Sequence, residues 1–194
     1  YNGVKVTDED ALPLQFVMSL LNNSSSTGLL DKLSMDGVVS SVGASLDTRR
    51  DCGRILVQAI PYYDANQQTY ESDAATSRIV MAELNKLKTG DIPEWLIQTV
   101  KAEFAQNYKL AFESSEVKMN ALVQSFIYET PIDDIFTEND KVQAFTKEDI
   151  QRIAKKYFDA NYITLSFNEG DPKKNKLAKP AIKPLELLNS QETE

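Results

Sequence analysis

Histidine, the side chain that most often moves protons in enzymes, is absent from this 194-residue chain, which also has a single cysteine, Cys52. A Ser-His-Asp triad, a Cys-His pair and a Cys/His zinc cluster therefore cannot be built from this chain alone. Carboxylates and lysines are the only bases left to activate Cys52, so we interpret it as a structural cysteine at a strand edge. A lone cysteine also excludes an internal disulfide.

Carboxylates are the remaining candidates for metal chemistry. The densest group comprises Asp133, Asp134, Glu138 and Asp140, and such oxygen ligands suit Mg²⁺ or Ca²⁺. The group lacks the spacing and the glycine of an EF-hand loop, which favours a solvated acidic loop. An unrelated α+β enzyme that uses these carboxylates is kept as an alternative.

Three other polar or aromatic groups invite a chemical interpretation. Ser24–Ser26 lack a nucleophile-elbow motif and a base, which favours a helix-terminating loop. Arg49 and Arg50 could hold a carboxylate, but an exposed basic turn is the simpler interpretation. Tyr62–Tyr63 could pack at a domain edge or line a groove. The sequence also contains no phosphate-binding glycine loop. We therefore predict no catalytic, cofactor-binding or metal-binding residue in this chain.

The overall composition is that of an ordinary globular protein, with 42% hydrophobic and 26% charged residues. The formal net charge is -8, which argues against a nucleic-acid partner and an anionic membrane surface. No apolar run reaches the roughly 18 residues of a membrane span. We therefore expect no nucleic-acid binding and no membrane insertion.

The first third of the chain predicts two helices and a hairpin. Thr7–Asp10 has the spacing of a capping box, and residues 28–33 predict a short helix. Strands are expected over residues 38–46, where apolar residues alternate with polar ones, and over residues 54–60. The apolar face expected for the first helix consists of Ala11, Leu14, Val17, Met18 and Leu21.

The middle of the chain predicts three helices. The first ends at Gly90. The second starts with Asp91 as its N-cap, and Leu96, Val100, Phe104, Tyr108 and Ala111 line one face. The third covers residues 116–128 and ends before Pro131. Its inward-facing residues are predicted to be Met119, Leu122, Val123 and Phe126.

The last elements are a helix and a strand. Thr146–Asp149 has the spacing of a capping box, and Ile150, Ile153, Ala154 and Tyr157 follow with helical spacing. Tyr162–Phe167 alternates as a strand does. Because hairpin strands pair antiparallel, the expected fold class is α+β, with an antiparallel sheet and helices packed on one face.

The composition changes after Gly170. Residues 171–194 contain three prolines and five lysines, which predicts an interdomain linker or tail after a single α+β domain over residues 1–170. The chain begins without methionine, so we expect it to be a piece of a longer protein.

Several of these segments, taken in order, resemble the insulinase-like (pitrilysin family) zinc metallopeptidases. The resemblance covers nearly the whole chain and is carried by four stretches: Thr27–Ala44, Ala82–Pro93, Phe145–Ile150 and Ala154–Phe158. Residues 171–184 look like the link to the next domain in bacterial members. The expected architecture is the metallohydrolase-like domain of the insulinase and processing-peptidase type.

The resemblance implies a position within such a peptidase. Its catalytic domain carries His-x-x-Glu-His and a distal Glu ligand, which this chain lacks. An Arg and a Tyr commonly bind substrate in the family's last domain; here Ser34 follows Leu33, and Ser40 or Ser41 stands near the Tyr position. The pattern is most similar to the second, non-catalytic domain. Zinc is then expected in the parent's catalytic domain and no cofactor in this chain.

The function that the resemblance implies is structural support for a zinc-dependent endopeptidase. The chain would help to wall its peptide chamber, and its partners would be the other domains of the same polypeptide and the peptide substrate. Alone it should be inactive. Bacterial relatives point to a periplasmic or cell-envelope location. The alternative is a catalytically silent interaction protein of the same fold, like a processing-peptidase partner or a respiratory-complex core subunit.

Overall fold

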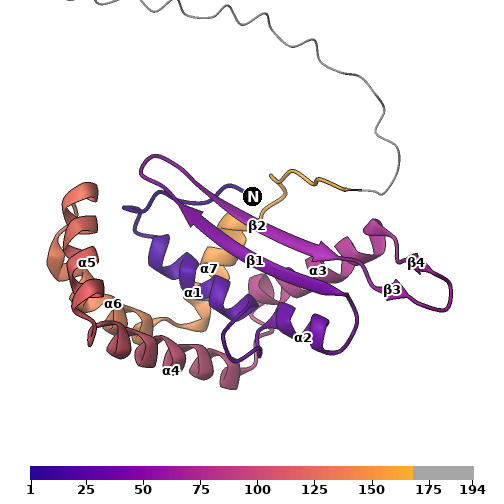
Figure 1. Cartoon of the computed structure of the whole chain (residues 1–194), viewed down its shortest axis with the longest axis horizontal. Coiled ribbons are helices and arrows are strands. Elements are labelled where there is room, and N and C mark those ends of the chain that lie inside the picture. Colours follow the sequence, from indigo (N-terminus) through magenta and orange to yellow (C-terminus); the bar gives the residue numbers. More distant parts are fainter. Residues whose placement is uncertain (168–194) are drawn as a thin grey trace, which may run out of the picture. The chain divides into compact units, whose positions relative to one another are not determined.

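The computed structural model describes residues 1–167. The chain separates into two units, residues 1–164 and residues 165–194, and every helix and strand described lies in the first (Figure 1). In the second unit, residues 165–167 are described and belong to no helix or strand. The predicted domain boundary at residue 170 and the predicted linker over 171–194 lie outside the described residues and stay predictions.

Helix α1 (Ala11–Leu21) is the centre of the core. The predicted inner face is confirmed for four of its five residues, and Phe16 and Leu20 are buried as well. A helix that is apolar nearly all round must be covered on several sides. Accordingly α1 contacts the hairpin, α2 (Leu29–Met35), α4 (Glu94–Ala111), α6 (Ile132–Ala144) and α7 (Lys147–Tyr157).

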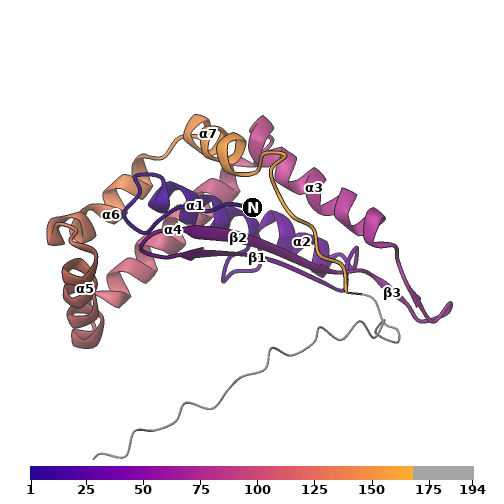
Figure 2. The same cartoon turned by 90° about the horizontal axis from the view of Figure 1, so that it is seen from above.

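The predicted hairpin is present, with shifted bounds, as strands β1 (Ser41–Thr48) and β2 (Gly53–Ile60). They pair antiparallel from Ser41 opposite Ile60 to Thr48 opposite Gly53. Leu56 and Ile60 are exposed on the open face, while the helices lie over the other face (Figure 2). The α+β prediction, with helices on one face of an antiparallel sheet, is therefore confirmed. The core-facing residues are Val42, Ala44, Leu46, Ile55 and Val57.

The two outer edges of the hairpin have different partners. On the β1 side, the Val42 amide donates to Ser34 Oγ at 3.1 Å and the Ala44 amide donates to Asn22 Oδ1 at 2.8 Å. On the β2 side, Ile55 exchanges backbone hydrogen bonds with Tyr1, both at 3.0 Å. Side chains thus block the start of β1, whereas main chain extends the sheet along β2.

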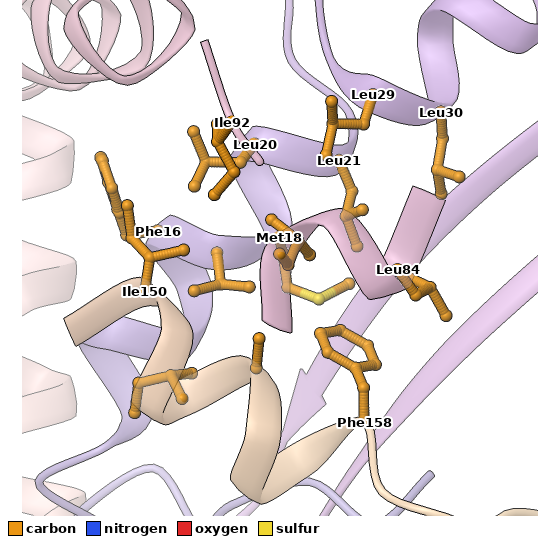
Figure 3. Packing of buried hydrophobic residues seen from close by; sticks show 14 of the residues in the cluster. Phe16, Met18, Leu20, Leu21, Leu29, Leu30, Leu84, Ile92, Ile150 and Phe158 are labelled. Carbon is orange, nitrogen blue, oxygen red and sulfur yellow. The ribbon is translucent and has the colours of Figure 1, made fainter. Parts of the chain in front are cut away.

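Helix α3 (Asp73–Thr89) ends where the sequence predicted, because Gly90 adopts the left-handed conformation with φ 76°. Together with α4 and α7 it contributes the second half of the core, where Leu84, Ile92, Ile150 and Phe158 converge on α1 (Figure 3). The short strands β3 (Tyr63–Asp64) and β4 (Thr69–Tyr70) form a second small hairpin that the sequence did not predict.

Helix starts were predicted unevenly. The capping box of α7 is confirmed: Thr146 Oγ1 accepts from the Asp149 amide at 3.3 Å, and Asp149 Oδ2 accepts from the Thr146 amide at 2.9 Å. The box at Thr7–Asp10 is wrong, because the Asp10 carboxylate makes no cap and binds α7 instead. Helix α4 begins after Pro93, two residues beyond the predicted N-cap Asp91.

Two predictions at the end of the chain and in α5 (Ser115–Tyr128) are wrong. Residues 161–167 form no strand, since alternation makes a segment extended but only a paired neighbour makes it a strand. The residues predicted to face inward in α5 are instead exposed, Phe126 to 86%. The helical period was right, but a period identifies a face without identifying what covers it.

Candidate functional site

An open groove with a volume of about 690 Å³ lies in the described part of the chain. One wall comes from α1 and the loop that follows it; the rest comes from α4, α5 and α6. Its lining includes Gln15, Ser19, Asn22, Asn23, Glu103, Phe104, Asn107, Tyr108, Phe112, Val117, Ala121 and Glu138.

The loop wall of the groove is held in place by Asp31 of α2. Its Oδ1 accepts from Asn22 Nδ2 at 2.7 Å, and its Oδ2 accepts from the Asn23 amide at 3.0 Å and the Gly28 amide at 3.0 Å. A carboxylate with three donors around it fixes the backbone of this loop. The groove is therefore bounded by a rigid polar wall rather than by a free loop end.

The opposite wall is apolar and aromatic. Tyr108 packs on Phe112 with ring centroids 4.7 Å apart, and Phe112 packs on Phe136 at 5.5 Å. The Tyr108 hydroxyl donates to the Ile135 carbonyl at 2.9 Å, which joins α4 to α6. Val117 and Ala121 close this side from α5. The predicted apolar face of α4 thus continues from the core into the groove.

Two carboxylates, Glu103 of α4 and Glu138 of α6, line the groove. No lysine or arginine lies among the described residues of its lining. Burial raises the pKa of Glu138; nearby Lys141 lowers it and Asp134 raises it, and the net pKa lies above the ordinary value. The described lining therefore contains two carboxylates and no basic side chain to pair with them.

One buried donor in the loop beside the groove has no hydrogen-bond partner among the described residues. Asn23 Oδ1 accepts from the Thr27 amide at 3.0 Å and the Thr27 hydroxyl at 3.2 Å. Its Nδ2 is buried and without a hydrogen-bond partner among the described residues. A buried polar atom left unpaired costs free energy, and this one has almost no accessible surface.

The exposed apolar stripe of α5 faces away from this groove. Met119, Leu122, Val123 and Phe126 recur at helical spacing, and no residue of α5 is buried. Val117 and Ala121 project from the other side of the same helix. An apolar patch of this kind on a globular protein usually contacts another protein surface.

The acidic residues singled out in the sequence lie on α6 and not in a loop, so the loop interpretation is wrong. Asp134 pairs with Lys141 at 3.1 Å, Glu138 faces the groove, and Asp133 and Asp140 are exposed. In the described part of the chain there is no group of three or more Cys, Asp or Glu placed to hold a metal ion. The residues present therefore do not fit a zinc site.

The remaining sequence candidates have structural surroundings. Cys52 is exposed in the hairpin turn, and Arg49 in the same turn pairs with Asp47 at 2.8 Å. Arg50 reaches Glu129 at the end of α5 at 3.8 Å. Ser24, from the serine run, lines the groove.

The two tyrosines after β2 separate. Tyr63 packs on Tyr70 across the small hairpin, with ring centroids 4.9 Å apart. Tyr62 lines a smaller hollow of about 320 Å³ beside Thr76 of α3. The serines near the family's substrate-binding positions serve the sheet. Ser34 Oγ accepts from the Val42 amide, Ser40 Oγ donates to the Pro61 carbonyl at 2.8 Å, and Ser41 is the first residue of β1.

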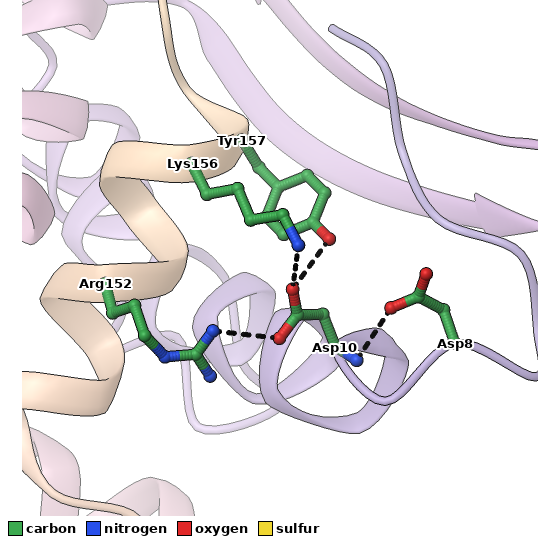
Figure 4. Close-up of polar contacts among 5 residues, drawn as sticks. All are labelled: Asp8, Asp10, Arg152, Lys156 and Tyr157. Atoms are coloured by element: carbon green, nitrogen blue, oxygen red, sulfur yellow. Dashed lines mark hydrogen bonds and ion pairs between the residues drawn. The ribbon is translucent and has the colours of Figure 1, made fainter.

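The sequence did not reveal an ionic cluster outside the groove, in which half-exposed cations surround a buried carboxylate. Asp10 is 1% exposed, and it accepts from Arg152 Nη1 at 3.0 Å, from Tyr157 Oη at 2.9 Å and from Lys156 Nζ (Figure 4). Burial alone would raise the pKa of Asp10, but the three donors outweigh it and the pKa lies below its ordinary value. All three partners belong to α7, so the cluster fastens the start of α1 to α7.

Several solved structures with the same fold are proteases or domains of proteases. A protease from Helicobacter pylori superposes with a TM-score of 0.69 at 17% identity, covering 82% of this chain and 37% of that chain. The peptidase M16 inactive domain from Pseudomonas fluorescens gives 0.65 at 15% identity, covering 80% and 35%. The inactive peptidase domain of a protein assigned as a zinc protease from Bordetella parapertussis gives 0.66 at 16% identity, covering 82% and 84%.

At these identities the likeness establishes a shared fold. The predicted resemblance to an insulinase-like inactive domain is confirmed in that sense. The chain spans little more than a third of the first two solved chains. No protein-family model and no curated protein matches the sequence. No helix in the described range is long and apolar enough to cross a membrane.

Proposed function

We propose that this chain is the non-catalytic domain of a zinc-dependent metalloendopeptidase, in which it supports the catalytic domain and helps to wall the peptide chamber. The observation that carries the proposal is the fold shared with inactive domains of M16 peptidases over about four fifths of the chain. Two of the solved proteins with this fold are more than twice the matched length, which fits a multidomain parent.

The chemistry of the groove supports a non-catalytic role. An inverted zinc motif, His-x-x-Glu-His, presents two histidines four residues apart on a helix. Gln15 and Ser19 of α1 have that spacing and line the groove together with Glu103. An amide and a hydroxyl do not supply the imidazole nitrogens that zinc needs to lower the pKa of a water molecule. This chain would therefore contribute shape and contacts, and its parent the metal.

Zinc binding and peptide cleavage by the chain alone test the absence of catalysis. We expect no stoichiometric zinc in metal analysis after equilibration and dialysis, and no cleavage of a quenched fluorescent peptide. Tight, stoichiometric zinc binding, or cleavage that a chelator stops, would contradict the proposal.

The chamber-wall role needs the full-length protein. Leu56 and Ile60 lie on the open face of the sheet, so Leu56→Asp should change KM for peptides without changing zinc content. Asp51→Asn in the exposed hairpin turn is the control. Unchanged kinetics in Leu56→Asp would remove the wall role from the proposal.

A further inference from the structure

We infer that the groove between α1, α4, α5 and α6 is a binding site for a peptide segment that places a lysine or arginine side chain against Glu103 and Glu138. The site is distinct from the open face of the sheet. Its existence does not depend on the proposed function. Only the source of the peptide does, which we take to be the polypeptide on which the parent acts.

The size of the groove selects a short segment. Its volume of about 690 Å³ lies within the range of about 300–1,000 Å³ typical of ligand sites. A folded domain would need a much broader surface. The exposed stripe of α5, which could serve a domain, faces the other way.

The charge of the groove selects a cation. Glu103 has one weak protein partner, Ser25 Oγ at 3.5 Å, and Glu138 has no ion pair within the described residues. Holding Glu138 charged while half-buried is unfavourable, and an incoming ammonium or guanidinium would offset that penalty by donating hydrogen bonds to the carboxylates.

The rest of the lining selects a peptide over a simple amine or metal ion. The side-chain amides of Gln15 and Asn107 can pair with main-chain groups. Phe104 and Ala121 offer apolar contact to flanking side chains. A cation alone would satisfy the carboxylates but would leave these side-chain amides and the apolar wall uncovered.

The wall is built before a ligand arrives. Asp31 fixes the loop that carries Asn23, and the Tyr108 hydroxyl fixes α4 against α6. Because little has to be ordered on binding, a short peptide can gain useful affinity there.

The test uses a matched pair of labelled nonapeptides of alanine and leucine, one with a central arginine and one with citrulline, its neutral isostere. Fluorescence anisotropy with the 194-residue chain should show the arginine peptide binding about ten-fold more tightly, since a hydrogen-bonded charge pair is worth that much or more. Equal affinities, or no binding at about millimolar protein, would overturn the inference.

Variants locate the site. Glu138→Gln should abolish the preference for arginine, whereas Glu116→Gln, the same change at an exposed position of α5, should retain it. If both variants keep or both lose the preference for the arginine peptide, Glu138 does not recognise the arginine and the proposed site is wrong. Ala121→Trp should block both peptides by filling the groove from α5, with thermal melting by circular dichroism as the check on folding.

Two further outcomes are decisive. A concentration-dependent dimer in sedimentation equilibrium that Ala121→Trp dissociates would show that a second copy occupies the groove, and would overturn the inference. Peptide binding by a chain whose parent proves not to be a peptidase would retain the site and reject only the proposed function.

Discussion

Arg152 of α7 donates to the buried carboxylate of Asp10 at 3.0 Å, joining residues 142 positions apart in the chain. Lys156 and Tyr157 share that carboxylate. The start of α1, the central helix of the core, therefore depends on a buried carboxylate whose charge is balanced by side chains of α7.

Removing that charge should destabilise the chain. In Asp10→Asn the amide cannot accept three donors, and Arg152 and Lys156 lose their counter-ion. Because Arg152 and Lys156 are about half exposed and water can solvate them, we expect the free energy of unfolding in urea to fall by about 1–3 kcal/mol. Asp51→Asn, the same change in the exposed turn, should alter it by less than about 0.5 kcal/mol. Equal effects would show that the cluster contributes little.

The same carboxylate makes stability depend on pH in a defined direction. Its pKa is lowered in the folded state, so its contribution is complete above the unfolded pKa of about 3.9 and is lost as pH falls through the folded pKa. The stability gap between wild type and Asp10→Asn should stay constant from about pH 7 to pH 5 and narrow below about pH 4. A gap that widens on acidification would contradict this.

Two phenylalanines have opposite exposures, and their truncation should have different consequences for stability. Phe158 is fully buried and Phe126 is 86% exposed. Phe158→Ala should lower the free energy of unfolding by about 3–5 kcal/mol through the cavity it leaves. Phe126→Ala should change it by less than about 0.5 kcal/mol. A large loss in Phe126→Ala would mean that α5 packs against the fold in solution.

Gly28 is required where α1 and α2 approach. A Cβ there would lie 2.3 Å from the Leu21 carbonyl oxygen, whereas a Cβ at Gly43 would meet nothing within 4 Å. We expect Gly28→Ala to destabilise by about 1–3 kcal/mol and Gly43→Ala to be neutral or slightly stabilising. Urea unfolding of both variants measures the difference, and a neutral Gly28→Ala would show that the loop wall can move.

The geometry of α1 and α4 also makes a prediction about metal. Gln15→His combined with Ser19→His should give the chain stoichiometric zinc binding, detectable by calorimetry, because the two imidazoles would face Glu103 at the spacing of an inverted zinc motif. Adding Glu103→Gln should weaken it. If the double variant binds no better than wild type, the two helices are not placed as a zinc pair.

Local patterns predicted α1, the β1–β2 hairpin and the start of α7 because each depends on residues within a few positions of one another. Thr146 and Asp149 form a capping box without help from elsewhere. Asp10 shows the limit: it has the spacing of a cap, but its actual partners come from α7, and no local signal indicates them.

The groove could not be predicted, because residues as far apart in the sequence as Asn23 and Glu103 line it together only in the folded chain. Helix α6 could have been: Pro131 precedes its first turn and Asp133 and Asp134 lie in it, which are ordinary helix-start signals. The density of acidic residues from Asp133 to Asp140 instead favoured a loop. For α5 the period was predicted correctly, but the direction of its stripe depends on neighbours that the sequence does not identify.

The side chains that pair with the outer amides of β1 limit strand addition at that edge of the hairpin. A two-stranded sheet with two open rims can template itself without end, as fibrils do. Here the side chains of Ser34 and Asn22 accept from the amides of Val42 and Ala44. A strand added at the β1 edge would therefore have to displace two existing hydrogen bonds. On the β2 side the main chain of Tyr1 and Gly3 already pairs with Ile55 and Gly53, so both edges of the hairpin are occupied over part of their length and neither offers an unbroken edge to a second copy.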